Sequence, residues 1–168
     1  KRPELATQLI DDLAWLGLEW DEGPYYQHDR LDLYEDALRQ LQDAGLTYPC
    51  FCTRAERHAA SAPHASDGTP IYRGACRGLS AEEVARRSIL RAPATRLRVP
   101  AVDDLADDVI EFVDRTYGAQ CEALATECGD FLVRRSDGVF AYQLAVVVDD
   151  ADMRITDVVR GDDHVNNT

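Results

Sequence analysis

The sequence lacks any apolar run close to the roughly 18 consecutive residues that a membrane-spanning helix needs, and no secretory signal pattern opens it. Its five cysteines are an odd number, so a complete set of disulfides is not expected and a reduced, cytoplasmic setting is favoured. Basic residues are also scarce, because 18 Lys and Arg are outnumbered by 31 Asp and Glu, for a formal net charge of −13. These shortages argue against a membrane protein, a disulfide-stapled secreted domain and an indiscriminate nucleic-acid binder, which needs many cations.

What the sequence does have is a composition suited to folding. Its 168 residues are 45% hydrophobic, enough to bury the core of one domain or of one domain with an insertion. The arginines are clustered, which leaves open a nucleic acid met through local positive charge, although a solvated surface is the simpler interpretation. The arginine groups are Arg54/Arg57, Arg73/Arg77, Arg86/Arg87/Arg91, Arg96/Arg98 and Arg134/Arg135.

Apolar residues at helical spacing predict two helices, over residues 3–17 and 29–45, and a capping box predicts a third over residues 80–91. The first carries a leucine every three or four residues, with Pro3 in its first turn and Gly17 at its end. The third begins at the capping box Ser80-Ala81-Glu82-Glu83. A similar box, Thr53-Arg54-Ala55-Glu56, predicts a further short helix.

Other segments predict strands. The stretches "TRLRVP" and "VIEFVDR" alternate polar and apolar residues, which is typical of strands with one buried face. The stretch "FLVRRSDGVFAY" predicts a hairpin that turns at Ser136-Asp137-Gly138. The short apolar runs in "AVVVDD" and "RITDVVRG" are predicted to be buried strands.

Three cysteines gather in "YPCFCTRAERHAASAPHASDGTPIYRGACRG", residues 48–78, and two of them are one residue apart. Soft thiolates at Cys50 and Cys52 can bind one metal ion if the chain turns tightly between them. The remaining ligands must then come from a separate segment, where Cys76 and Tyr72 are the available candidates. A tyrosine ligand is chemically costly, since free Tyr titrates near pKa ~10 and only the cation itself would keep it deprotonated.

Other interpretations of these residues stay open. His58 and His64, between the two cysteine motifs, are alternative ligands. Without a metal, the three clustered cysteines are small core residues, and Cys121 and Cys128 are assigned to the core outright. The usual zinc signature is a pair of Cys-x-x-Cys motifs, so the spacing here does not by itself decide between these interpretations.

Three separated motifs, in family order, resemble the glutamyl-tRNA synthetase family of class I aminoacyl-tRNA synthetases. Residues 129–168, "GDFLVRRSDGVFAYQLAVVVDDADMRITDVVRGDDHVNNT", are similar to the helix-strand-helix run of the family's nucleotide-binding fold that ends in Arg-Gly-Asp-Asp-His. The stretch "LAWLGLEWDEGPYYQHDR" is similar to the segment after the family's first βα unit, and "YPCFCTR" with "IYRGACR" to its zinc-bearing insertion.

The resemblance implies an α/β fold, namely a class I synthetase nucleotide-binding (Rossmann-like) catalytic domain that carries a zinc-bearing insertion. Residues 1–47 would form a helical part of the catalytic domain and residues 48–128 the zinc-bearing insertion region. Residues 129–168 would form the second half of the nucleotide-binding domain, which is expected to be incomplete at both ends. The implied ligands of a structural zinc ion are Cys50, Cys52, Tyr72 and Cys76.

Two branches of the family fit the sequence. Glutamyl-tRNA synthetases charge glutamate tRNA at its terminal ribose. A shortened paralogue without an anticodon-binding domain, the glutamyl-Q tRNA(Asp) synthetase, activates glutamate without tRNA and transfers it to queuosine in the anticodon of aspartate tRNA. The paralogue is favoured by Cys-x-Cys with Tyr-x-x-x-Cys, by Gly78 where synthetases with a Cys-x-His motif place a histidine ligand, and by "GVFAYQLAVVVDD". The end of the sequence, "RGDDHVNNT", looks more like bacterial glutamyl-tRNA synthetases.

The resemblance also implies roles for individual residues. Tyr142 and Arg160 match the tyrosine and arginine that line the family's glutamate pocket, and a guanidinium can pair bidentately with a carboxylate. Asp163 and His164 lie where the family meets the adenylate or nucleotide. Without the family, Tyr142 would be interpreted as a core aromatic residue and Arg160 as a surface residue at the end of a strand.

The implied partners are glutamate, ATP with Mg²⁺, and tRNA, for a protein expected to be monomeric and away from membranes. The family's two ATP signatures, of the His-Ile-Gly-His and Lys-Met-Ser-Lys-Ser types, are both missing from these 168 residues. We therefore expect an internal fragment of a full-length ligase. The alternatives are a non-catalytic module that binds zinc and tRNA, or, outside the family, a small structural zinc protein.

Overall fold

The computed structural model describes residues 3–53, 56, 71–72, 74–99 and 109–161 of the chain. The chain divides into two compact units, residues 1–30 and 31–168. The first unit holds helix α1 (Pro3–Trp15) and a 3₁₀ turn, η1 (Gln27–Asp29). Gly17 follows α1 with φ at 76°, a left-handed conformation that ends a helix and that glycine adopts without strain. The first predicted helix is confirmed.

The core of the second unit is built around α2 (Leu31–Asp43) and α5 (Tyr142–Asp152). Leu38 of α2 is fully buried against Val133 and Leu144. The hydroxyl of Tyr34, also fully buried, donates to both carboxylate oxygens of Asp149 on α5, at 2.9 and 2.8 Å. The second predicted helix is thus confirmed, although it begins two residues after Asp29, which belongs to η1.

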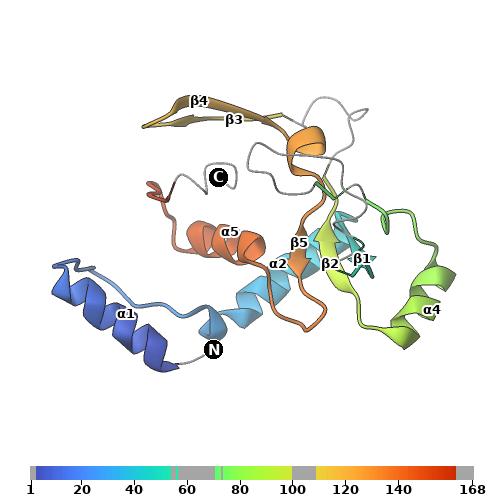
Figure 1. Cartoon of the computed structure of the whole chain (residues 1–168), viewed down its shortest axis with the longest axis horizontal. Coiled ribbons are helices and arrows are strands. Elements are labelled where there is room, and N and C mark those ends of the chain that lie inside the picture. The colour runs from blue at the N-terminus through green and yellow to red at the C-terminus, as the bar shows by residue number, and fades with distance from the viewer. Residues whose placement is uncertain (1–2, 54–55, 57–70, 73, 100–108, 162–168) are drawn as a thin grey trace. The chain divides into compact units, whose positions relative to one another are not determined.

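A three-stranded antiparallel sheet lies beside these helices, with β2 between β1 and β5 (Figure 1). Its strands are β1 (Thr47–Cys50), β2 (Ala94–Leu97) and β5 (Leu132–Arg134). Tyr48 pairs with Arg96 and Cys50 with Ala94, so the side chains of Tyr48, Cys50 and Arg96 share one face of the sheet. The predicted strand in "TRLRVP" is confirmed, and so is the hairpin at residues 136–138, where Arg134 pairs with Phe140.

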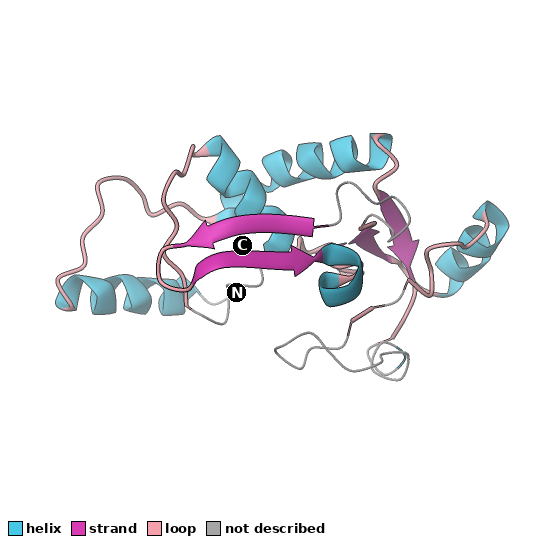
Figure 2. Ribbon diagram, turned by 90° about the horizontal axis from the view of Figure 1, so that it is seen from above, coloured by secondary structure: helices cyan, strands magenta, loops and turns pink. Residues whose placement is uncertain are grey.

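A second sheet is the hairpin of β3 (Val109–Asp114) and β4 (Gly118–Ala123), whose two strands run side by side in Figure 2. It confirms the strand predicted in "VIEFVDR". A five-residue π-helical turn, η2 (Leu124–Cys128), follows β4. Cys121 lies exposed on β4, so its assignment to the core is wrong, because one face of this two-stranded ribbon is solvated. Cys128 is half-buried.

One of the two predicted capping boxes forms completely and the other in half. The Ser80 hydroxyl accepts a hydrogen bond from the Glu83 N–H at 3.2 Å and begins α4 (Ala81–Leu90), which confirms the third helix, while the Glu83 carboxylate pairs with Arg86 and Arg87. Thr53 and Glu56 exchange both bonds of the box, at 2.6 and 3.1 Å. The helix predicted after Glu56 lies outside the described residues.

Two predicted strands are wrong. The run "AVVVDD" lies within α5, because Leu144 and Val148, one helical turn apart, both pack on the Leu38 cluster and this packing decides the conformation. The run "RITDVVRG" has no regular secondary structure, and its apolar residues are mostly exposed, so no sheet buries them.

The described residues therefore combine helices with two antiparallel sheets. The parallel strands typical of a nucleotide-binding fold are not among them. In the part of the chain that the structure describes, no helix has both the length and the apolar character needed to cross a membrane.

Candidate functional site

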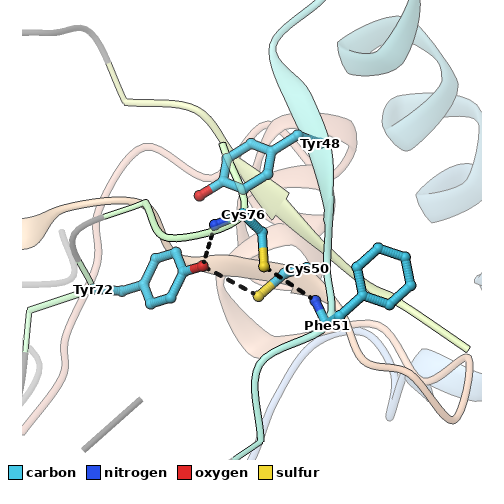
Figure 3. Packing of buried hydrophobic residues seen from close by; sticks show 5 residues of the cluster. All are labelled: Tyr48, Cys50, Phe51, Tyr72 and Cys76. Atoms are coloured by element: carbon cyan, nitrogen blue, oxygen red, sulfur yellow. Dashed lines mark hydrogen bonds between the residues drawn. The ribbon is translucent and has the colours of Figure 1, made fainter. Parts of the chain in front are cut away.

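Four predicted ligand side chains converge where β1 ends (Figure 3 draws three of them). The Tyr72 hydroxyl oxygen lies 3.5 Å from Cys50 Sγ and 3.4 Å from Cys52 Sγ. Cys52 Sγ lies 3.5 Å from Cys76 Sγ, and the three sulfurs lie within 4.8 Å of one another. The chain turns tightly at Phe51, whose N–H points at Cys76 Sγ at 3.4 Å. These four side chains are called the donor cluster below.

The spacing of the donor cluster fits a small tetrahedral metal site. With Zn–S bonds of about 2.3 Å and a Zn–O bond of about 2.0 Å, tetrahedral geometry places two sulfurs about 3.8 Å apart and a sulfur and an oxygen about 3.5 Å apart. The distances from the Tyr72 oxygen to two of the sulfurs, and the distance between the Cys52 and Cys76 sulfurs, are close to these values. Thiolate sulfur is also a ligand that zinc prefers. The donor cluster could therefore hold a metal ion. The alternative ligands His58 and His64 lie outside the described residues.

Burial and hydrogen bonding shift the pKa values of three members of the donor cluster. Burial, followed by hydrogen bonding to Cys52 and Cys50, raises the pKa of Tyr72 far above its ordinary value. Burial raises the pKa of Cys52 to about 11. For Cys50, burial acts in the same direction, but hydrogen bonds from Tyr72, the Cys52 backbone and Arg96 outweigh it and lower the pKa. Full ionisation thus requires a bound metal ion, whose binding would release protons.

The backbone fixes Tyr72 through a close contact with residue 129. Tyr72 and Gly129 form an isolated parallel bridge, and Gly129 has φ at 67°. A Cβ atom there would lie 2.7 Å from Ile71 Cγ2 and 2.9 Å from the Tyr72 carbonyl oxygen. Only glycine permits this approach. The phenol is further held by the Cys76 N–H, which donates to its oxygen at 3.0 Å.

Two charged residues beside the donor cluster were not predicted. Arg96, interpreted from the sequence as solvated surface, is only 3% exposed, because its guanidinium lies over the Tyr72 ring and donates to Cys50 on the neighbouring strand. Asp130 is buried too, and its carboxylate accepts hydrogen bonds from the Tyr48 hydroxyl at 2.6 Å and the Val99 N–H at 2.8 Å. No sequence signal marks Arg96, since the pairing of β1 with β2 is a long-range contact.

Of the two predicted glutamate-binding residues, one belongs to α5 and the other forms an ion pair with it. Tyr142 is its first residue and is 44% exposed, so it is not a buried core aromatic. Arg160, which follows α5 in the chain, forms an ion pair with Asp150 of α5 at 3.0 Å. Asp150 lies eight residues beyond Tyr142, or about 12 Å along the helix axis. Asp163 and His164 lie outside the described residues.

Comparison with known proteins places the chain in a family. The model for "tRNA synthetases class I (E and Q), catalytic domain" matches residues 1–168. The chain belongs to this family. The predicted class I synthetase catalytic domain is thereby confirmed, whereas a zinc-bearing insertion stays a prediction.

Relatives of two kinds are similar over nearly the whole chain. The chain is 48% identical to the glutamyl-Q tRNA(Asp) synthetase of Symbiobacterium thermophilum and 40% identical to the glutamate–tRNA ligase of the same organism, with 99% of the chain matched in both cases. Glutamate–tRNA ligase 1 of Halorhodospira halophila is 46% identical, also over 99% of the chain. The chain spans 53% of the first protein's length and 36% of each ligase's length. The predicted resemblance to glutamyl-Q tRNA(Asp) synthetases is confirmed.

A solved structure agrees with the fold. The glutamate tRNA ligase from Elizabethkingia meningosepticum, crystallised in complex with its amino acid, superposes with a TM-score of 0.74 at 25% identity. The superposition covers 98% of this chain and 35% of that protein.

Proposed function

We propose that the full-length protein activates glutamate with ATP and transfers it to queuosine in the anticodon of aspartate tRNA. The observation that carries this proposal is the donor cluster, in which a tyrosine hydroxyl stands as the fourth donor beside three thiols. The relatives support it, because the glutamyl-Q tRNA(Asp) synthetase of Symbiobacterium thermophilum is closer to this chain than that organism's glutamate–tRNA ligase.

The fourth donor distinguishes the two branches. Gly78 stands where synthetases with a Cys-x-His motif are expected to place a histidine ligand, and it lies exposed in the turn after Cys76. A Cβ at Gly78 would meet no heavy atom within 4 Å, so the turn has room for a larger side chain that this protein does not use. Tyr72 takes the place of that ligand in our proposal.

The metal is proposed to be one structural zinc ion held by the donor cluster. With four protein donors the site is closed, so it has no open position for a substrate. A zinc ion bound there would cross-link the segment of Cys50 and Cys52 to the segment of Tyr72 and Cys76, about twenty residues further along the chain. We assign residues 48–128 to the zinc-bearing insertion region and residues 1–47 and 129–168 to the catalytic domain on either side.

The chemistry proposed for the substrate site relies on positioning and charge. The Arg160 guanidinium pairs with a glutamate carboxylate, and the Tyr142 hydroxyl orients it. Asp150 takes one donor of the Arg160 fork and thereby fixes its direction. Asp163 and His164 are proposed to contact the nucleotide.

Two displacements then follow. The glutamate α-carboxylate attacks the α-phosphorus of ATP, whose Mg²⁺ neutralises the phosphates, and pyrophosphate leaves to give glutamyl-adenylate. A hydroxyl of queuosine's cyclopentene-diol next attacks the activated carbonyl, AMP leaves, and the hydroxyl proton is lost as the ester forms.

A second candidate is a glutamyl-tRNA synthetase, which the 46% identity to the Halorhodospira halophila ligase favours. In that case the attacking hydroxyl belongs to the terminal ribose of glutamate tRNA. A third candidate is a non-catalytic module that binds zinc and tRNA.

Pyrophosphate exchange separates these candidates. We expect the full-length protein to exchange radiolabelled pyrophosphate into ATP in a glutamate-dependent manner without any tRNA. Exchange that appears only after glutamate tRNA is added would favour the second candidate. A folded protein with no exchange under either condition would leave the non-catalytic module.

A further inference from the structure

Arg96 joins three parts of the site in one side chain. It sits diagonally opposite Cys50 on the shared face of β1 and β2. Its Nε donates to Cys50 Sγ at 3.3 Å, and its guanidinium carbon lies 3.6 Å from the centre of the Tyr72 ring. Its Nη1 donates to the backbone carbonyl of Asp130 at 2.5 Å. Two members of the donor cluster are thus tied to Asp130, two residues before β5.

This guanidinium needs a negative partner. Arg96 is 3% exposed, and a charge removed from water is unfavourable unless an opposite charge compensates it. Within the described ranges, no carboxylate pairs with Arg96 at salt-bridge distance. The carboxylate of Asp130, whose backbone carbonyl Arg96 contacts, instead accepts hydrogen bonds from Tyr48 and Val99 and pairs with Arg77 at 3.3 Å.

A donor cluster with a bound metal ion would carry the negative charge that compensates the Arg96 guanidinium. Three thiolates around a divalent cation leave one negative charge uncompensated, and a phenolate ligand adds another. The guanidinium touches this cluster at both a sulfur and an aromatic face, which is the arrangement expected of a second layer that orients metal ligands.

We propose that Arg96 is the positioning residue of the metal site, which holds Cys50 and Tyr72 in place and balances the charge of the loaded cluster. The proposal rests on the zinc part of the proposed function and is independent of which tRNA is served.

The test measures the zinc affinity of the full-length protein, by competition with a chelator of known affinity, for the wild type, Arg96→Met and Arg96→Lys. Arg98→Met is the matched control, because Arg98 is two residues along the chain, lies over the Tyr48 ring at 5.3 Å and donates to the Arg77 carbonyl instead of a sulfur. Cobalt is then substituted for zinc, since its thiolate absorption bands report on the ligands directly.

We expect Arg96→Met to bind zinc about 10- to 100-fold more weakly and Arg98→Met to stay within about twofold of the wild type. Arg96→Lys should recover part of the loss, because it keeps the charge but neither stacks on Tyr72 nor donates from Nε. The thiolate band of the cobalt protein should change in both Arg96 variants and not in Arg98→Met.

Arg96→Met with unchanged zinc affinity and an unchanged cobalt spectrum would overturn the inference. If that variant does not fold, Arg96→Lys decides in the same way, since equal affinity would show that neither the stacking nor the Nε bond matters. A wild-type protein that binds no zinc would reject the metal site itself, and the Arg96 inference with it.

Discussion

Replacing Cys50 with serine is expected to empty the metal site of the full-length protein. Cys50 lies 3.5 Å from the Tyr72 hydroxyl and is almost fully buried. Serine would replace its soft thiolate with a hydroxyl, which is a much poorer ligand for zinc. Structural zinc contributes on the order of 10 kcal/mol in small sites, so its loss should unfold the segment around the donor cluster locally. The measurement is zinc content by elemental analysis, combined with limited proteolysis around residues 48–78.

Cys121→Ser is the matched control, because Cys121 is exposed on β4 and belongs to no cluster of metal-ligating side chains among the described residues. It should keep its zinc and its resistance to protease. The Leu38 cluster shares no residue with the donor cluster, so Cys50→Ser should retain the helical signal of α2 and α5. A wild-type protein purified without chelator that contains less than about half an equivalent of zinc would contradict the closed site. So would full zinc content in Cys50→Ser.

Replacing Arg160 with alanine is expected to abolish glutamate-dependent pyrophosphate exchange. Removing one partner of a desolvated charge pair costs about 2–5 kcal/mol, or roughly 30- to several-thousand-fold in affinity or rate. The fold should survive, because Asp150, which pairs with Arg160 at 3.0 Å, is partly exposed and can be hydrated. The measurement is the exchange rate as a function of glutamate concentration.

Arg115→Ala provides the comparison, since Arg115 also pairs with an aspartate, Asp157 at 2.7 Å, but both side chains are exposed. Exposed pairs of this kind contribute little, so this variant should exchange at the wild-type rate. Wild-type glutamate affinity in Arg160→Ala would remove Arg160 from the substrate site.

Local signals in the sequence predicted much of this fold. The capping box at Ser80 and the glycine after α1 act through neighbouring residues, so the helices they bound could be predicted without knowing the rest of the molecule. The turn at residues 136–138 is equally local, since the Arg135 N–H bonds to the Val139 carbonyl across it.

The predictions that were wrong concern residues whose structure depends on contacts between distant segments of the chain. The β-branched run before Asp149 is typical of a strand, yet its packing on Leu38 and Val133 makes it helical. Arg96 alternates with apolar residues as a solvent-facing residue of a strand does, and only the pairing of β2 with β1 shows that it is buried.

The donor cluster was predicted partly from a local signal and partly from the family resemblance. The spacing of Cys50 and Cys52 indicates a metal site, but the choice of Tyr72 and Cys76 as partners came from a family resemblance. The structure brings all four together, through a bridge between Tyr72 and Gly129 that no local pattern predicts.

The most direct test of the proposed function is transfer of radiolabelled glutamate by the full-length protein to two purified tRNAs, queuosine-modified aspartate tRNA and glutamate tRNA. Each RNA is then split into anticodon and acceptor fragments to locate the label, and unmodified aspartate tRNA serves as the control. We predict label on the anticodon fragment of the modified aspartate tRNA and none on the unmodified one. Label on the acceptor end of glutamate tRNA would contradict the account and identify a glutamyl-tRNA synthetase instead.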